Sequence, residues 1–88
     1  MSEFAVKILS PGGLPVERIA QSVLFHIVDG ETEIYPDHAP ALFQLGRGEL
    51  VIRNAAGPEH WVIQGGIAHF ENSVLTFLAE KAENAATA

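Results

Sequence analysis

Four histidines and a run of acids are the side chains of this sequence that could bind a metal ion. A jelly-roll metalloenzyme of the cupin type needs two histidines two residues apart, with a nearby carboxylate, so that the ligands converge from one strand face. No such pair occurs among His26, His38, His60 and His69. His60 and His69 could meet across a sheet corner, but two ligands do not hold a metal firmly. We therefore expect ordinary strand histidines and no metal site.

Nucleophilic chemistry has no better support in the sequence. The serines are Ser2, Ser10, Ser22 and Ser73, and none of them stands in a G-x-S-x-G elbow. The glycines of Gly46-Arg47-Gly48 do not predict a phosphate-binding loop, because no helix follows whose N-terminus could bind a phosphate. The segment is more typical of a β-turn. We expect no catalytic residue and no cofactor.

The most informative segment runs from Asp29 to Leu45 and combines alternating acids with two prolines. Asp29, Glu31 and Glu33 are spaced by two, so they would point the same way from an extended segment. Such a row is either a solubilising edge that discourages strand pairing or a docking tip for a basic loop. Pro36 and Pro40 then flank His38, which predicts a rigid connection suited to a turn or to an interface.

Composition narrows the possible partners. Eighty-eight residues form one domain, and a hydrophobic content of 48% predicts either a generous core or an apolar surface for a partner. Zero cysteines exclude a disulfide scaffold, and the net charge of −6 disfavours nucleic acid and direct binding to anionic lipid. No apolar run is long enough to span a bilayer, and the first residues do not read as a signal peptide. We expect a soluble, unsecreted protein that reaches a membrane only through a partner.

Period-two alternation dominates the sequence and predicts the fold. Apolar residues alternate along short segments, such as Phe4, Val6 and Ile8, or Trp61 and Ile63. The segment from Val16 to Val28 reads as one long or bent strand, and Gly65-Gly66 reads as a bulge or a tight corner. Short strands with frequent turns predict an all-β protein, a small antiparallel β-sandwich.

The last residues break this pattern. Ala79 to Ala88 is rich in alanine and charge and has good helix propensity, but it lacks an apolar stripe. We therefore divide the chain into a sandwich domain over residues 1–79 and a short tail over residues 80–88, which is either helical or disordered.

Four motifs follow one another in order between residues 4 and 80. The first is the opening strand and break from Val6 to Gly13, and the second is the acidic turn G-E-T-E-I-Y-P-D-H-A-P-A-L from Gly30 to Leu42. The third is the L-G-R-G-E-L-V-I step from Leu45 to Ile52. The fourth is Gly65-Gly66, followed by Asn72, Val74 and Leu78-Ala79-Glu80. In this order they resemble the N-terminal β-sandwich of the epsilon subunit of F-type ATP synthases. The I-Y-P-D-H-A-P core is the most specific part of the resemblance.

The resemblance implies a non-catalytic rotor subunit of the central stalk, which links the gamma subunit to the c-ring and couples ion transport to ATP synthesis and hydrolysis. Family contacts with the c-ring map onto Asp29, Glu31 and Glu33. Those with gamma map onto Ser10, His38, Ala41, Leu42 and Phe43. The subunit would lie at the cytoplasmic face of the bacterial inner membrane, held there by the complex.

The sequence also departs from the family pattern. Glu33 replaces a glycine before the isoleucine, and Glu17-Arg18 stands where a glycine is often found. The helical hairpin that usually follows the sandwich is not present in these 88 residues, so helix-based inhibition is not expected from them. The alternative function is a free-standing small β-sandwich that acts as a binding module or a cupin-like metalloprotein.

Overall fold

The structure is a computed structural model that describes residues 2–85, and these residues form an all-β fold. The strands are β1 (Phe4–Leu9), β2 (Val16–Ala20), β3 (Ser22–Ile27), β4 (Gly30–Ile34), β5 (Ala41–Gln44), β6 (Arg47–Asn54), β7 (Gly57–Glu71) and β8 (Val74–Asn84). The predicted all-β class is confirmed. Within the described range there is no helix that could cross a membrane.

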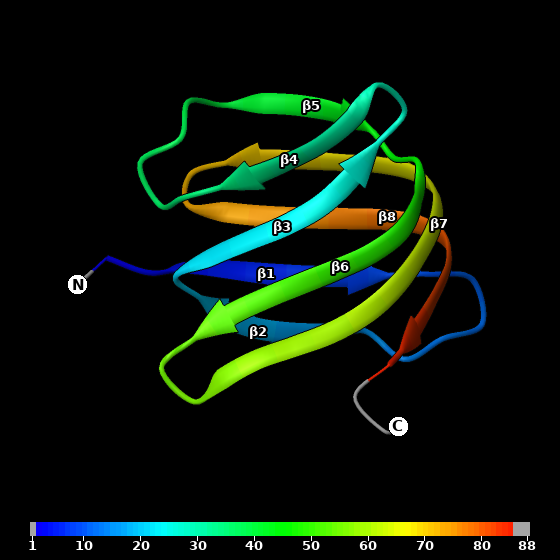
Figure 1. The fold of residues 1–88 in the computed structure, drawn as a ribbon, viewed down its shortest axis with the longest axis horizontal. Helices are drawn as coiled ribbons and strands as arrows, with labels where there is room; N and C mark the ends of the chain where they lie inside the picture. The colour runs from blue at the N-terminus through cyan, green and yellow to red at the C-terminus, as the bar shows by residue number, and fades with distance from the viewer. Residues whose placement is uncertain (1, 86–88) are drawn as a thin grey trace.

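One continuous sheet folds over to make the two faces of the sandwich. Its strand order is β2-β1-β8-β7-β6-β3-β4, with β5 paired to β7 beside this path. All neighbours are antiparallel except β1 and β8, which run parallel. The first half of β7 pairs with β6 and the second half pairs with β5, so β7 serves both halves of the sheet. Figure 1 shows β7 and β8 curving around one side of the molecule.

The core lies between these two halves and follows the predicted alternation. The inward side chains include Phe4, Val6, Ile8, Leu50, Ile52, Trp61, Ile63, Ala68, Phe70, Leu75 and Phe77, all of them buried. Phe25 lies among them and makes edge-to-face contacts with Phe43 and Phe77, with ring centroids 5.4 and 5.0 Å apart. Burial of this apolar set is the main stabilising term of the fold.

Gly65 and Gly66 form the corner of β7, as the sequence predicted. Both have positive φ, +66° and +105°, a conformation that side chains disfavour. The corner changes which residues point inward: Ile63 is buried before it and Ala68 after it, so strict alternation is broken by one residue. A Cβ on Gly66 would overlap the carbonyl oxygen of Leu78, so the backbones of β7 and β8 approach as only glycine permits.

Two predictions about strand limits are corrected by the structure. The expected single strand from Val16 to Val28 is divided at Gln21 into β2 and β3, which belong to different halves of the sheet. The amide of Gln21 donates a 2.7 Å hydrogen bond to the carbonyl of Arg53 at this crossing. The helical or disordered tail is also wrong over residues 80–84, which continue β8 across the expected domain limit at residue 79. Residues 86–88 of that tail lie outside the described residues.

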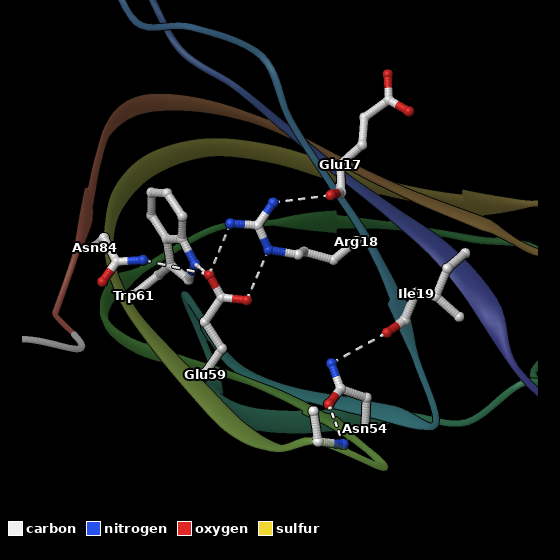
Figure 2. A network of polar contacts seen from close by, with 8 residues as sticks. Glu17, Arg18, Ile19, Asn54, Glu59, Trp61 and Asn84 are labelled. Atoms are coloured by element: carbon white, nitrogen blue, oxygen red, sulfur yellow. Dashed lines mark hydrogen bonds and ion pairs between the residues drawn. The ribbon is translucent and has the colours of Figure 1, made fainter.

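A polar network closes one side of the sandwich where β2 faces β7 (Figure 2). Arg18 and Glu59 occupy inward positions on these strands, because Arg18 is opposite the core residue Val6 and Glu59 is opposite the core residue Ile52. The Arg18 guanidinium donates to both oxygens of Glu59, at 2.8 and 3.1 Å. Trp61 Nε1 and Asn84 Nδ2 also donate to Oε2 of Glu59, at 3.0 and 3.3 Å. The Arg18 hydrogen bonds are the main reason that the pKa of Glu59 is lowered.

We expect Gly66→Ala to lower the free energy of unfolding by about 3 kcal/mol or more, because the new Cβ meets backbone at a position with positive φ. Gly57→Ala is the matched control: its φ is +113°, yet nothing lies within 4 Å of the added Cβ. At Gly57 only the backbone strain should lower the free energy of unfolding, by about 1–2 kcal/mol. Urea denaturation followed by Trp61 fluorescence measures both; equal losses would contradict the close approach at the corner.

Candidate functional site

An apolar patch covers the outer face of the half-sheet formed by β5, the second half of β7, the first half of β8, and β1. We define the patch as Leu9, Leu42, Ile67 and Leu78. Ile67 is directly opposite Leu78, and Leu78 is opposite Leu9, so three strands contribute one row. Leu42 is 68% exposed, Leu78 46% and Ile67 40%. Solvent-exposed apolar side chains gathered on one sheet face are typical of a protein docking surface.

Ser10 lies at one end of this patch. It follows Leu9 at the end of β1 and lines a shallow depression of about 350 Å³ together with Pro11, Leu78 and Glu80. The turn that begins here is fixed by a 3.1 Å hydrogen bond from the Gly13 amide to the Ser10 carbonyl. The patch therefore joins Ser10 to Leu42, two of the residues that the resemblance assigned to one partner.

The other three residues of that assignment, His38, Ala41 and Phe43, lie beside the core rather than in the patch. Ala41 and Phe43 are opposite Phe70 and Ala68, so they occupy the inward positions of β5, where only Leu42 and Gln44 point outward. The ring of His38 lies against Phe43 and Phe70, with centroids 6.2 and 6.0 Å away. His38 Nδ1 is 2.6 Å from the Ala39 carbonyl oxygen, which orients the ring over this end of the core.

The acidic segment lies at a different place, on the β3–β4 hairpin. Asp29 is exposed in the turn, and Glu31 points outward from β4 opposite His26. The Glu31 carboxylate is 53% exposed and 3.7 Å from Nε2 of His26. Val28, 55% exposed, adds an apolar side chain beside Asp29. The turn thus offers negative charge together with a small apolar contact.

Glu33 differs from the other two acids because its charge is partly satisfied within the domain. Its side chain is 26% exposed and lies 3.7 Å from Nη1 of Arg53. Glu33 also raises the pKa of the Tyr35 hydroxyl, through hydrogen bonding first and through its negative charge second. We infer that Asp29 and Glu31, rather than all three acids, present the charge of this turn to solvent.

His26, His60 and His69 each stand beside one glutamate. His60 Nδ1 is 2.7 Å from Oε2 of Glu49, and His69 Nε2 is 3.3 Å from Oε1 of Glu71. His60 and His69 lie on the two halves of β7, on either side of the glycine corner. In residues 2–85 no three side chains of His, Asp or Glu come together as metal ligands would.

Sequence reasoning missed Ile67 and Leu78 as surface residues. The signal was present in the alternation: Ala68 and Phe70, like Leu75 and Phe77, are apolar residues spaced by two, which places Ile67 and Leu78 on the other face. What the alternation lacked was the pairing of β1, β7 and β8, which brings these side chains into one patch.

Comparison with known proteins decides the family. A family model for the ATP synthase delta/epsilon chain β-sandwich domain matches residues 3–85. The chain belongs to this family. It is 35% identical over 86 residues to the ATP synthase epsilon chain of Lactobacillus delbrueckii subsp. bulgaricus, covering 93% of this chain and 59% of the relative. It is 28% identical over 82 residues to the sodium ion specific epsilon chain of Propionigenium modestum, covering 93% of this chain and 60% of that relative.

Two solved structures share the family fold. One is the Euglena gracilis mitochondrial ATP synthase, a complex of OSCP, F1 and c-ring, with a TM-score of 0.84, 19% identity, and coverage of 93% of this chain and 53% of that one. The other is the central stalk and c-ring of the Tetrahymena thermophila mitochondrial ATP synthase, with a TM-score of 0.71, 15% identity, and coverage of 89% and 63%. This chain therefore spans about three fifths of the length of its curated relatives.

We expect Leu42→Gln to change the free energy of unfolding by no more than about 0.5 kcal/mol, because the side chain is in solvent. Phe43→Ala should cost about 2–4 kcal/mol, because its ring packs on Phe25 and against the core. Urea denaturation of both variants checks this contrast. A large loss in Leu42→Gln would mean that the patch is structural rather than available for docking.

Proposed function

We propose that this chain is a non-catalytic rotor subunit of the central stalk of a rotary ATP synthase, where it connects the gamma subunit to the c-ring. Membership of the delta/epsilon β-sandwich family supports the complex. The observation that supports the role is that one sandwich carries two separate exposed surfaces of different chemistry: the apolar patch on one sheet face and the acidic β3–β4 turn. A part that couples two partners needs both surfaces and a fixed distance between them.

The apolar patch is the proposed gamma site. Its row of Leu9, Ile67 and Leu78 would form the buried centre of the interface, with Ser10 and Leu42 at its two ends. Apolar side chains at the centre of an interface contribute most of the binding energy, whereas the rim contributes less. In this arrangement Ala41 and Phe43 act mainly by shaping β5 from behind, because they occupy the core side of that strand, and His38 contacts Phe43 from the loop before it.

The acidic turn is the proposed c-ring site. The family resemblance implies basic loops on the c-ring, which the exposed carboxylates of Asp29 and Glu31 would meet with complementary charge. Complementary charge favours fast and correctly oriented association more than high affinity. Glu33 would assist indirectly, since it is held by Arg53 at the base of the hairpin.

In this role the chain performs no bond chemistry, and the nucleotide sites belong to other subunits. It would transmit rotation between the ion-driven ring and gamma, and so couple ion transport to ATP synthesis and hydrolysis. Its place would be peripheral, at the cytoplasmic face of the bacterial inner membrane, held there by the complex.

We expect Ile67→Asp to weaken binding to the gamma subunit of the same organism by roughly 30-fold or more, because a charge would be buried in the apolar centre of the interface. Val62→Asp is the matched control, since Val62 is 42% exposed, against 40% for Ile67, and lies on the first half of β7. Native mass spectrometry of the mixed subunits measures the complex. Equal loss in the two variants, or no complex with the unsubstituted chain, would contradict the gamma site.

We expect Glu31→Lys to lower ATP-driven ion pumping in membrane vesicles and to make attachment of the complex more sensitive to salt, because it reverses charge at the proposed c-ring contact. Glu71→Lys is the control, because both glutamates are 53% exposed and each stands beside one histidine. Unchanged pumping in Glu31→Lys, with the variant incorporated normally, would refute this contact.

A further inference from the structure

The C-terminal part of β8 is held on one side only. Residues 74–78 lie between β1 and β7, but β1 ends its pairing at Leu9, and beyond Leu78 only β7 is a partner. Ala79 is the last core residue of β8; beyond it Glu80, Lys81, Glu83 and Asn84 are exposed, and Ala82 is partly buried. A strand end with one neighbour and little buried apolar area is the kind of segment that opens locally.

This end is attached to the sandwich through the β7 ladder, in which residues 81–84 lie opposite Gln64 to Trp61, and through a small number of contacts beyond it. The Ala85 amide donates a 2.8 Å hydrogen bond to the His60 carbonyl. The Asn84 side chain donates to Oε2 of Glu59, and that carboxylate is held in turn by Arg18 from β2 and by the indole of Trp61 (Figure 2). Glu59 thus links the end of β8 to an edge strand with which β8 does not pair.

The same end of β8 covers part of the core. Ala82 lines a depression of about 260 Å³ together with Trp61, Ile8, Val16 and Ser10. Trp61 is only 8% exposed and Ile8 only 1% in this arrangement. If residues 81–85 left β7, Ala82 would leave with them, which would expose the indole and remove one wall beside the Ser10 turn.

We propose that residues 81–85 are a strap that opens from β7 as a unit, and that the Glu59 carboxylate is the latch that keeps it closed. The latch is polar where the rest of the sandwich interior is apolar, so it can break and re-form without repacking the core. Since Ser10 lines the covered depression, strap opening changes the support of one end of the apolar patch. The proposed strap and latch depend only on these contacts within the chain and not on which partner binds the patch.

Glu59 is the central residue of the latch because all the other members of the network donate hydrogen bonds to its carboxylate. Arg18 donates to both of its oxygens, whereas Asn84 and Trp61 share Oε2. Hydrogen bonds to an ionised carboxylate are stronger than those to a neutral amide. Replacing Glu59 by glutamine keeps the size of the side chain but removes the charge and one of the two acceptors, so it weakens every bond of the network at once.

Hydrogen exchange of the 88-residue chain tests the strap. In the unsubstituted chain, amides of residues 81–85 should exchange faster than those of residues 74–78, and their exchange should depend less on urea than global unfolding does, because the opening exposes only the surface around Ala82 and Trp61. Glu59→Gln should speed exchange at residues 81–85 by about tenfold, the factor that corresponds to losing about 1.4 kcal/mol of latch stabilisation. Exchange at residues 74–78 should stay unchanged, and acrylamide should quench Trp61 fluorescence more strongly.

Glu33→Gln is the matched control, because Glu33 is also paired with an arginine and is 26% exposed, against 20% for Glu59. It should leave exchange at residues 81–85 unchanged. Arg18→Gln removes the latch from the other strand and should reproduce the local effect, which keeps the test decisive if Glu59→Gln folds poorly. The strap is overturned if both latch variants speed exchange equally along the whole of β8, or if neither changes it.

Discussion

The close approach of β7 and β8 at Gly65 and Gly66 is the constraint on which the rest of the fold depends. Only residues without a Cβ fit there, because the Leu78 carbonyl occupies the space that a side chain at Gly66 would need. The corner lets one strand pair with β6 before it and with β5 after it. It also moves the inward face by one residue, so that both halves of β7 contribute to the same core. Without it, the sheet would not fold over on itself.

Folding one sheet over leaves places where the two halves must be joined by side chains, and the chain uses two kinds of chemistry for this. The His38 ring covers Phe43 and Phe70 through aromatic contacts, which depend on buried area. Arg18 and Glu59 join β2 to β7 through charge. Phe43 and Phe70 belong to or pack against the core, whereas the ionic contact is partly exposed to solvent and can open independently. Local mobility is therefore expected near β2 and the end of β8.

The outer faces follow from the same geometry. Because every strand alternates, a core residue on one face leaves its neighbours on the other, and on β7 and β8 those neighbours include Ile67 and Leu78. An isolated domain gains nothing from exposing them. In the ATP synthase delta/epsilon β-sandwich family, the proposed docking role would account for their presence and for the separate acidic turn. The two surfaces differ in chemistry: the patch would bury apolar area against a partner, whereas the acidic turn would pair with opposite charge.

The sequence by itself determined the strand class, the inward residues of most strands, the Gly65-Gly66 corner and the family. These depend on local patterns, namely side-chain alternation and the backbone freedom of glycine, and can be read without knowing which strands pair. Tertiary structure alone decided that residues 80–84 are strand, because pairing with β7 overrides the helix propensity of an alanine-rich segment. It also decided that Arg18 meets Glu59, 41 residues away, and that Glu33 is held by Arg53. Such pairs form only when distant strands are brought together, and no local pattern of charge specifies them.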